Sequence, residues 1–130
     1  MRGLDGRTYI VTGAASGIGW ATAARLLDEG ARVVGADLVE NADVPGGGVG
    51  GGGDRWLFCR VDVADEASVA QLVRAAMGFG GTVDGLVNAA GVAGGGPVHM
   101  LPSQEWARVI AVNLTGTFLT AKHVIGQMLS

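Results

Sequence analysis

Three glycines near the N-terminus are spaced in a way that suits phosphate binding. The segment Thr12 to Gly19 reads Thr-Gly-Ala-Ala-Ser-Gly-Ile-Gly, between a short β-branched run and a helical pattern. Gly13 suits a turn with positive φ, Gly17 lets a ligand approach the backbone, and Gly19 lets the helix pack closely. The unpaired N–H groups of that helix would then face a diphosphate. The residues predicted to form this site are Gly13, Ser16, Gly17, Ile18 and Gly19.

An acidic residue at the end of the next predicted strand completes the pattern of a dinucleotide site. Asp37 lies 18 residues after Gly19. A carboxylate at that distance accepts hydrogen bonds from the two adenosine ribose hydroxyls. It would repel a 2′-phosphate, and no arginine is close to it in the sequence. The sequence therefore predicts NAD rather than NADP, with the alternative that Asp37 only ends a strand or caps a turn.

Strands and helices alternate along the chain around these residues. A parallel, doubly wound Rossmann-type sheet in three α/β layers is expected, with about four strands in the order 3-2-1-4 and cofactor bound where the order reverses. Asp65 and Ser103 are the predicted caps of the second and third helices. The predicted strands cover 8–11, 31–36, 56–61 and 86–88, and the predicted helices cover 17–29, 66–77 and a long segment from 103.

Composition limits the other possibilities. The 130 residues suffice for one domain (1–130), and 48% of them are apolar, enough for a packed core. Seven glycines fall within 46–53, so 39–54 is predicted to be a mobile, glycine-rich surface loop. The formal net charge of −3, without a basic stripe, argues against nucleic-acid binding.

Targeting signals and disulfides are not expected either. The longest charge-free run, 85–104, is interrupted by Asn88, two prolines and three consecutive glycines, so it does not predict a membrane span. The N-terminus has no apolar core of the length that a secretory signal needs. Cys59 is the only cysteine and cannot form an internal disulfide. Together these features predict a cytoplasmic protein.

With these motifs in place, the chain resembles the short-chain dehydrogenase/reductase family. Its loop matches the family pattern Thr-Gly-x-x-x-Gly-x-Gly, and Asn-Ala-Ala-Gly at 88–91 matches the second signature. The resemblance implies that Asp62 and Val63 contact adenine and that Asn113 helps to hold a water in a proton relay. It also implies that the second signature supports the cofactor through Asn88, Ala89 and Gly91. Two structural alternatives stay open: Asn88 ties strand ends together, or Asn113 bonds the backbone at a helix kink.

The same resemblance implies an oxidoreductase that transfers hydride between an alcohol or ketone and the nicotinamide of NAD. The family uses a serine and a tyrosine whose pKa is lowered by a lysine four residues later. This sequence has one tyrosine, Tyr9, and one lysine, Lys122, so it contains no such pair. The 130 residues are therefore expected to be the N-terminal cofactor-binding half and to be catalytically incompetent alone. The alternatives are a free-standing NAD-binding module and an interaction protein that has lost the ligand.

Other candidate chemistry is weaker. His99 and His123 have no companion ligands at metal spacing, and no serine belongs to a recognisable nucleophile triad, so no metal site is predicted. The fourth strand would leave one edge open, and the long last helix carries an apolar stripe without a partner. These two features predict self-association, and thus a homo-oligomer.

Overall fold

A four-stranded parallel sheet lies at the centre of the computed structural model, which describes residues 3–47 and 53–130. The strand order is β3-β2-β1-β4, so the chain reverses its direction of winding next to β1. Both the order and the parallel pairing confirm the sequence prediction. The strands are β1 (Thr8–Thr12), β2 (Arg32–Asp37), β3 (Trp56–Arg60) and β4 (Gly85–Asn88).

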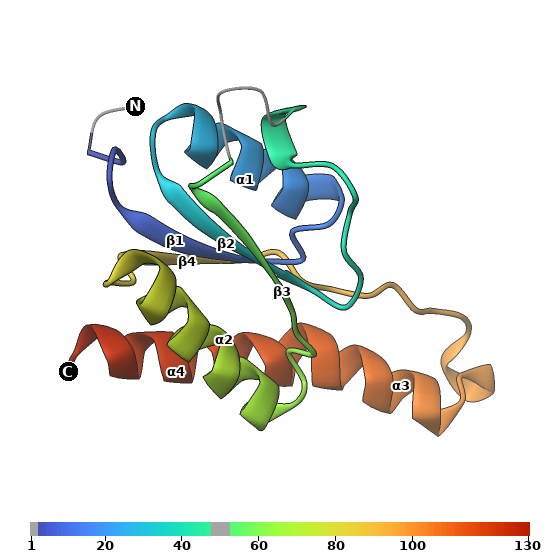
Figure 1. Cartoon of the computed structure of the whole chain (residues 1–130). Coiled ribbons are helices and arrows are strands. Elements are labelled where there is room, and N and C mark those ends of the chain that lie inside the picture. Colours follow the sequence, from blue (N-terminus) through green and yellow to red (C-terminus); the bar gives the residue numbers. More distant parts are fainter. Residues whose placement is uncertain (1–2, 48–52) are drawn as a thin grey trace.

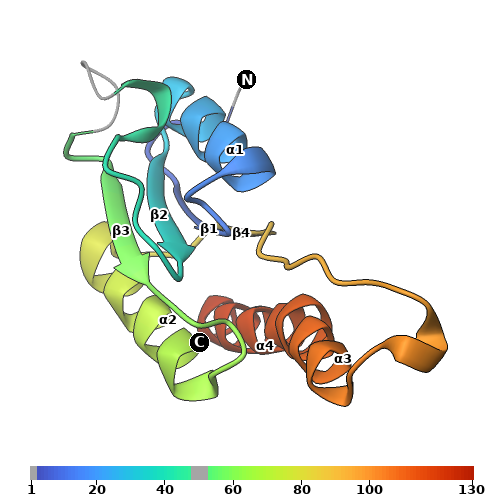
Figure 2. The ribbon, with the colours of Figure 1, turned by 90° about the vertical axis from the view of Figure 1, so that its right-hand side faces the viewer.

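Helices cover the sheet on both faces, which gives the predicted three layers. Figure 2 shows α1 on one side of the strands and α2 with α4 on the other. The four strands and the helices α1, α2 and α3 start within one residue of their predicted starts. The helix α2 continues past its expected end to a left-handed cap at Gly81. No separate start was predicted for α4, because one long helix from 103 was expected. The helices are α1 (Gly17–Asp28), α2 (Glu66–Gly80), α3 (Ser103–Ile110) and α4 (Gly116–Met128), with short 3-10 turns at Pro45–Gly47 (η1) and Val98–Met100 (η2).

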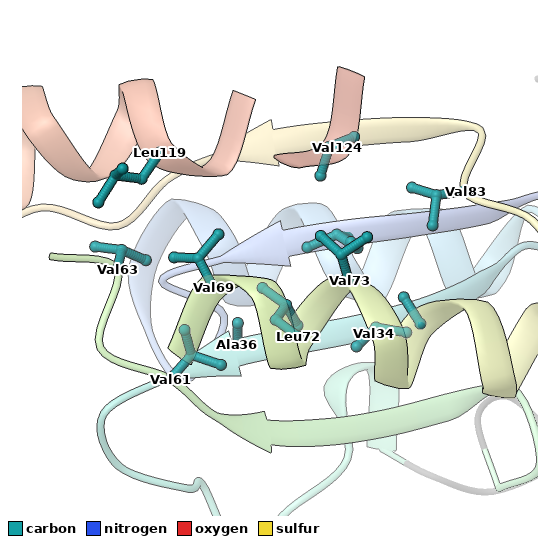
Figure 3. Packing of buried hydrophobic residues seen from close by; sticks show 12 residues of the cluster. Val34, Ala36, Val61, Val63, Val69, Leu72, Val73, Val83, Leu119 and Val124 are labelled. Atoms are coloured by element: carbon teal, nitrogen blue, oxygen red, sulfur yellow. The ribbon is translucent and has the colours of Figure 1, made fainter. Parts of the chain in front are cut away.

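The larger hydrophobic core lies between the sheet and the pair α2 and α4. Side chains from the strands, such as Val34 and Ala36, meet Val69, Leu72 and Val73 of α2 in Figure 3. Leu119 and Val124 of α4 complete this layer. A smaller cluster on the opposite face packs the strands against α1. Burial on both faces explains why the central strands read as continuous apolar runs in the sequence.

The two predicted helix caps have different outcomes. Asp65 caps α2 as expected, because its carboxylate accepts a hydrogen bond from the Ala67 N–H at 3.1 Å. The prediction that Ser103 caps the next helix is wrong. Ser103 is the first helical residue, and the N–H groups of Glu105 and Trp106 instead donate to the Pro102 carbonyl oxygen at 3.1 Å. The extended backbone of Pro102 takes the cap position without any side-chain hydrogen bond.

The long last helix is a composite. A π-helical turn, Ala111–Thr115, joins α3 to α4, and the three segments follow one another without a break in Figure 1. The combined helix, Ser103–Met128, is long and apolar enough to cross a membrane by length and composition alone: one 18-residue window has a mean hydropathy of 1.2, and 22% of that window is buried. This helix extends beyond the longest charge-free run, 85–104, because it contains charged residues. A core helix of a soluble protein passes the same test, and here α4 packs against α2 and β4.

Part of the predicted glycine-rich loop is packed against α1. Pro45 in η1 is buried, and Gly46 lies over Ala24. The sequence predicted a surface segment with no packed face, and the burial of Pro45 differs from that prediction. A single buried proline packs this part of the loop against α1, although the loop has no apolar periodicity. Residues 48–52 of this predicted loop lie outside the described residues.

Candidate dinucleotide-binding site

A cleft of about 290 Å³ opens at the carboxyl ends of the strands, where the strand order reverses. The segments that follow β1, β2, β3 and β4 all contribute to it. Of the residues predicted to bind the cofactor, those that line the cleft are Gly13, Ser16, Gly17, Ile18, Asp37, Asp62, Val63, Ala89 and Gly91. The sequence analysis did not single out Ala36, Leu38, Val61, Ala90, Val92 and Val112, which also line it.

Close contact between the two signature motifs requires a glycine at position 13. Gly13 has a φ of +65°, and a Cβ there would lie 2.6 Å from the Ala89 carbonyl carbon and 2.7 Å from the Ala90 nitrogen. Thr12 adds a polar tie, since its hydroxyl oxygen accepts from the N–H groups of Ala89 and Ala90 at 3.2 and 3.1 Å. The sequence analysis did not identify this role of Thr12, although the threonine belongs to the motif it quoted.

Gly19 has the packing role that its spacing indicates. A Cβ on Gly19 would collide with the carbonyl group of Gly13, so the first turn of α1 can lie against the loop only without a side chain there. Gly19 is buried and is not among the residues that line the cleft. Ser16 occupies the N-cap position of α1 in extended conformation and makes no capping hydrogen bond.

The carboxylate of Asp37 is held by backbone groups at the end of β2. Its Oδ2 accepts from the Ala15 N–H at 3.0 Å, and its Oδ1 accepts from the Leu38 N–H at 2.7 Å. The fold also brings Arg60 next to it, as the register partner of Asp37 on β3. Arg60 follows Asp37 by 23 positions in the sequence, so proximity along the chain does not indicate this pairing. Arg60 is exposed.

The turn between β3 and α2 supplies the residues expected at adenine. Asp62 accepts from the Ala64 N–H at 3.0 Å, which folds the turn over the end of the strand. Val63 is 8% exposed and packs against α4. A Cβ on Gly116 would lie 2.6 Å from the Val63 side chain, so this glycine lets the helix approach the cleft.

Asn88 and Asn113 are exposed, and neither is among the residues that line the cleft. The Oδ1 of Asn88 accepts from the buried Thr120 hydroxyl at 2.6 Å, which ties β4 to α4. The side chain of Asn113 accepts from the Val92 N–H at 2.8 Å and donates to the Val92 carbonyl at 3.0 Å. Asn88 therefore ties the end of a strand to a helix rather than to another strand end, and Asn113 fixes the backbone of Val92, which lines the cleft.

The remaining candidates for chemistry lie outside this cleft. Tyr9 packs on Gly85 of β4, and Lys122 donates to the Glu66 carboxylate at 2.7 Å. His123 contacts the same carboxylate at 2.8 Å, and the two basic neighbours lower the pKa of Glu66. Burial raises the pKa of the Cys59 thiol. Among residues 3–47 and 53–130, no group of three or more His, Cys, Asp or Glu side chains could hold a metal ion.

These features define a class. A loop of backbone amides after β1, an acidic residue after β2 and a cleft at the switch point of a parallel sheet are the elements of a dinucleotide-binding α/β domain. The family model for short chain dehydrogenases matches residues 7–130. The chain belongs to the short-chain dehydrogenase family, whose members generally bind NAD(P).

Individual relatives agree with this assignment. The chain is 46% identical over 123 residues to cis-4-hydroxycyclohexanecarboxylate dehydrogenase of Sinomonas cyclohexanicum, covering 94% of the chain and 49% of the relative. It is 44% identical to D-threitol dehydrogenase of Mycolicibacterium smegmatis, covering 97% and 49%. The solved ligand-free aldohexose dehydrogenase of Thermoplasma acidophilum matches with a TM-score of 0.86 at 29% identity, over 97% of this chain and 46% of that one. The chain therefore spans about half the length of the relatives it matches.

Proposed function

We propose that this chain is the cofactor-binding half of an NAD-dependent oxidoreductase that transfers hydride between an alcohol or ketone and nicotinamide. The observation that carries the proposal is the convergence of the glycine loop, Asp37 and the 88–91 segment on one cleft. The relatives reported above are named as dehydrogenases of hydroxylated compounds, which supports an alcohol or ketone substrate. When bound, the nicotinamide would supply the hydride acceptor or donor.

The residues that are present fit a dinucleotide. Around Gly17, which has a φ of +58°, nothing lies within 4 Å of a Cβ position, so the loop is open to a ligand at the start of α1. Backbone N–H groups there and the positive end of the helix dipole would hold the diphosphate. Asp37 would accept from the ribose hydroxyls, and Val63 with Asp62 would form the wall at adenine.

A preference for NAD over NADP is part of the proposal. The two backbone donors on Asp37 keep its carboxylate at the mouth of the cleft, where a 2′-phosphate would meet a like charge. Arg60 is the nearest register neighbour of opposite charge. No ion pair joins it to Asp37 in the described part of the chain, so the carboxylate charge is not offset by a direct contact.

We extend the proposal to assembly and location. Four large apolar side chains along the last helix, Trp106, Leu114, Phe118 and Ile125, are between 52% and 64% exposed. Within the described residues β4 pairs with β1 alone. An open edge and an apolar helix face favour a homo-oligomer, which sedimentation over a range of concentrations would test. The single cysteine, which leaves no internal disulfide, favours a cytoplasmic location.

The proposed function is tested by titrating the chain with NADH. We expect saturable binding, and we expect Asp37→Ala to weaken it by about 1.5–3 kcal/mol, roughly ten- to 150-fold, because hydrogen bonds to a charged group are lost. Asp28→Ala is the matched control: it removes the same charge from the exposed end of α1 and should leave affinity unchanged. Equal affinity of the wild-type chain and Asp37→Ala would contradict the proposed role of this carboxylate.

A further inference from the structure

One residue of the glycine loop, Ala15, is held at both its N–H and its carbonyl group by the end of β2 and the segment that follows it. The Ala15 N–H donates to the Asp37 carboxylate at 3.0 Å. The Ala15 carbonyl oxygen accepts from the Asn41 side-chain amide at 3.1 Å. Just before it, the Ala14 N–H donates to the Ala36 carbonyl oxygen at 3.2 Å, so the loop continues the pairing of β1 with β2. Asn41 is therefore the last of three successive ties between these segments.

Asn41 is itself fixed at its other end. Its Oδ1 accepts from the Asp43 N–H at 3.0 Å, which leaves the amide nitrogen pointing at Ala15. The residue is half-buried and is not among those that line the cleft. A contact with the cofactor does not explain its place, whereas a tether on the back of the glycine loop does.

The tether acts on the Asp37 carboxylate through the backbone of Ala15, whose carbonyl group Asn41 holds and whose N–H donates to Asp37. Because Asn41 holds the Ala15 carbonyl, the N–H of the same residue stays in line with Asp37 Oδ2. The Leu38 N–H holds Oδ1 at 2.7 Å, so both carboxylate oxygens keep a defined direction toward the cleft. If Ala15 moved, Asp37 would lose one of its two donors and gain access to other rotamers.

We propose that Asn41 is a positioning residue that sets the selectivity of this site for an unphosphorylated adenosine ribose. The inference rests on the proposed NAD-binding function. By tethering Ala15, Asn41 keeps the Asp37 carboxylate where it accepts from the 2′- and 3′-hydroxyls and repels a 2′-phosphate. Removing the Asn41 side chain weakens the binding of NAD and at the same time reduces the repulsion of NADP. The ratio of NAD affinity to NADP affinity therefore falls.

The experiment compares NADH and NADPH affinities of the wild-type chain, Asn41→Ala and Asn41→Asp. Asn41→Asp keeps an acceptor for the Asp43 N–H and a similar shape but removes the donor to Ala15. Glu40→Gln is the control for local charge, since Glu40 is exposed and adjacent in sequence. We expect Asn41→Ala to bind NADH about two- to tenfold more weakly, with a smaller or opposite change for NADPH. Asn41→Asp should weaken NADH similarly, but its added carboxylate also repels a 2′-phosphate, so its NADH affinity tests the tether and Asn41→Ala tests the ratio. Glu40→Gln should keep the wild-type ratio.

Amide hydrogen exchange at Ala15 in the free chain gives a second reading that needs no cofactor. We expect faster exchange in both Asn41 variants, because the loop opens more easily without the tether. An unchanged NADH-to-NADPH ratio in Asn41→Ala, with both affinities lowered equally, would overturn the positioning role. Unchanged exchange at Ala15 would overturn the tether. If the wild-type chain bound neither cofactor, the proposed function would fail first and the selectivity inference with it.

Discussion

Replacing Gly13 with alanine should disrupt the contact on which the candidate site is built. A methyl group at this position would lie 2.6 Å from the Ala89 carbonyl carbon and oxygen, both backbone atoms. A non-glycine residue at a φ of +65° costs about 1–2 kcal/mol, and overpacking costs typically about 1–3 kcal/mol more. The lower entropy of the unfolded alanine chain offsets about 0.4–1 kcal/mol. We therefore expect Gly13→Ala to lower the free energy of unfolding by about 1–4.6 kcal/mol.

Urea denaturation followed by circular dichroism measures this effect. Gly78→Ala is the matched control, because Gly78 lies inside α2 and nothing is within 4 Å of its Cβ position. The same substitution there should be neutral or stabilise the chain by up to about 1 kcal/mol, since alanine favours a helix more than glycine does. A Gly13→Ala variant as stable as Gly78→Ala would refute the close approach of the two motifs.

Three further substitutions test other parts of the account. Thr12→Val should cost about 1–3 kcal/mol in urea denaturation, because it leaves the N–H groups of Ala89 and Ala90 without their acceptor. Thr8→Val should instead be neutral or stabilising by about 1 kcal/mol, since the buried Thr8 hydroxyl has no hydrogen-bond partner in the described part of the chain. A loss of stability equal to that of Thr12→Val would contradict this expectation. Glu66 has a pKa below its ordinary 4.5, so its stabilising effect is complete above pH 4.5 and is lost as the pH falls through the lowered pKa. The melting temperature of Glu66→Gln should therefore fall less steeply with acid than that of the wild-type chain. Parallel curves of melting temperature against pH would contradict this role of Glu66.

The strand order and the core of the site follow from local sequence patterns. The loop from Gly13 to Gly19 is a continuous segment, so its place between β1 and α1 could be predicted from the spacing of its glycines. Asp37 could be predicted in the same way, because β2 follows α1 with only a short turn. Parallel strands then bring both to one edge of the sheet.

The features that the sequence analysis missed depend on contacts between distant segments. Arg60 becomes a neighbour of Asp37 only through the register of β2 with β3. Thr120 meets Asn88 across 32 positions, and Asn41 meets Ala15 across 26. None of these pairs has a periodicity or a spacing that indicates its partner.

The cap of α3 and the π-helical turn after this helix were not predicted correctly, because both depend on backbone geometry that residue types do not indicate. The cap at the start of α3 depends on a backbone carbonyl, that of Pro102, and a serine signal one residue later was misleading. The π-helical turn at 111–115 shows no departure from apolar helical spacing in the sequence. It is marked instead by the Asn113 side chain leaving the helix to pair with Val92.

The central claim is that backbone amides at the start of α1 and the carboxylate after β2 together hold one dinucleotide. A crystal structure of the chain grown with NADH tests it most directly. The account predicts the diphosphate against the N–H groups of 16–18 and the adenosine ribose hydroxyls on Asp37. A nucleotide seated elsewhere, or a cleft that the chain's own side chains fill at saturating NADH, would contradict it.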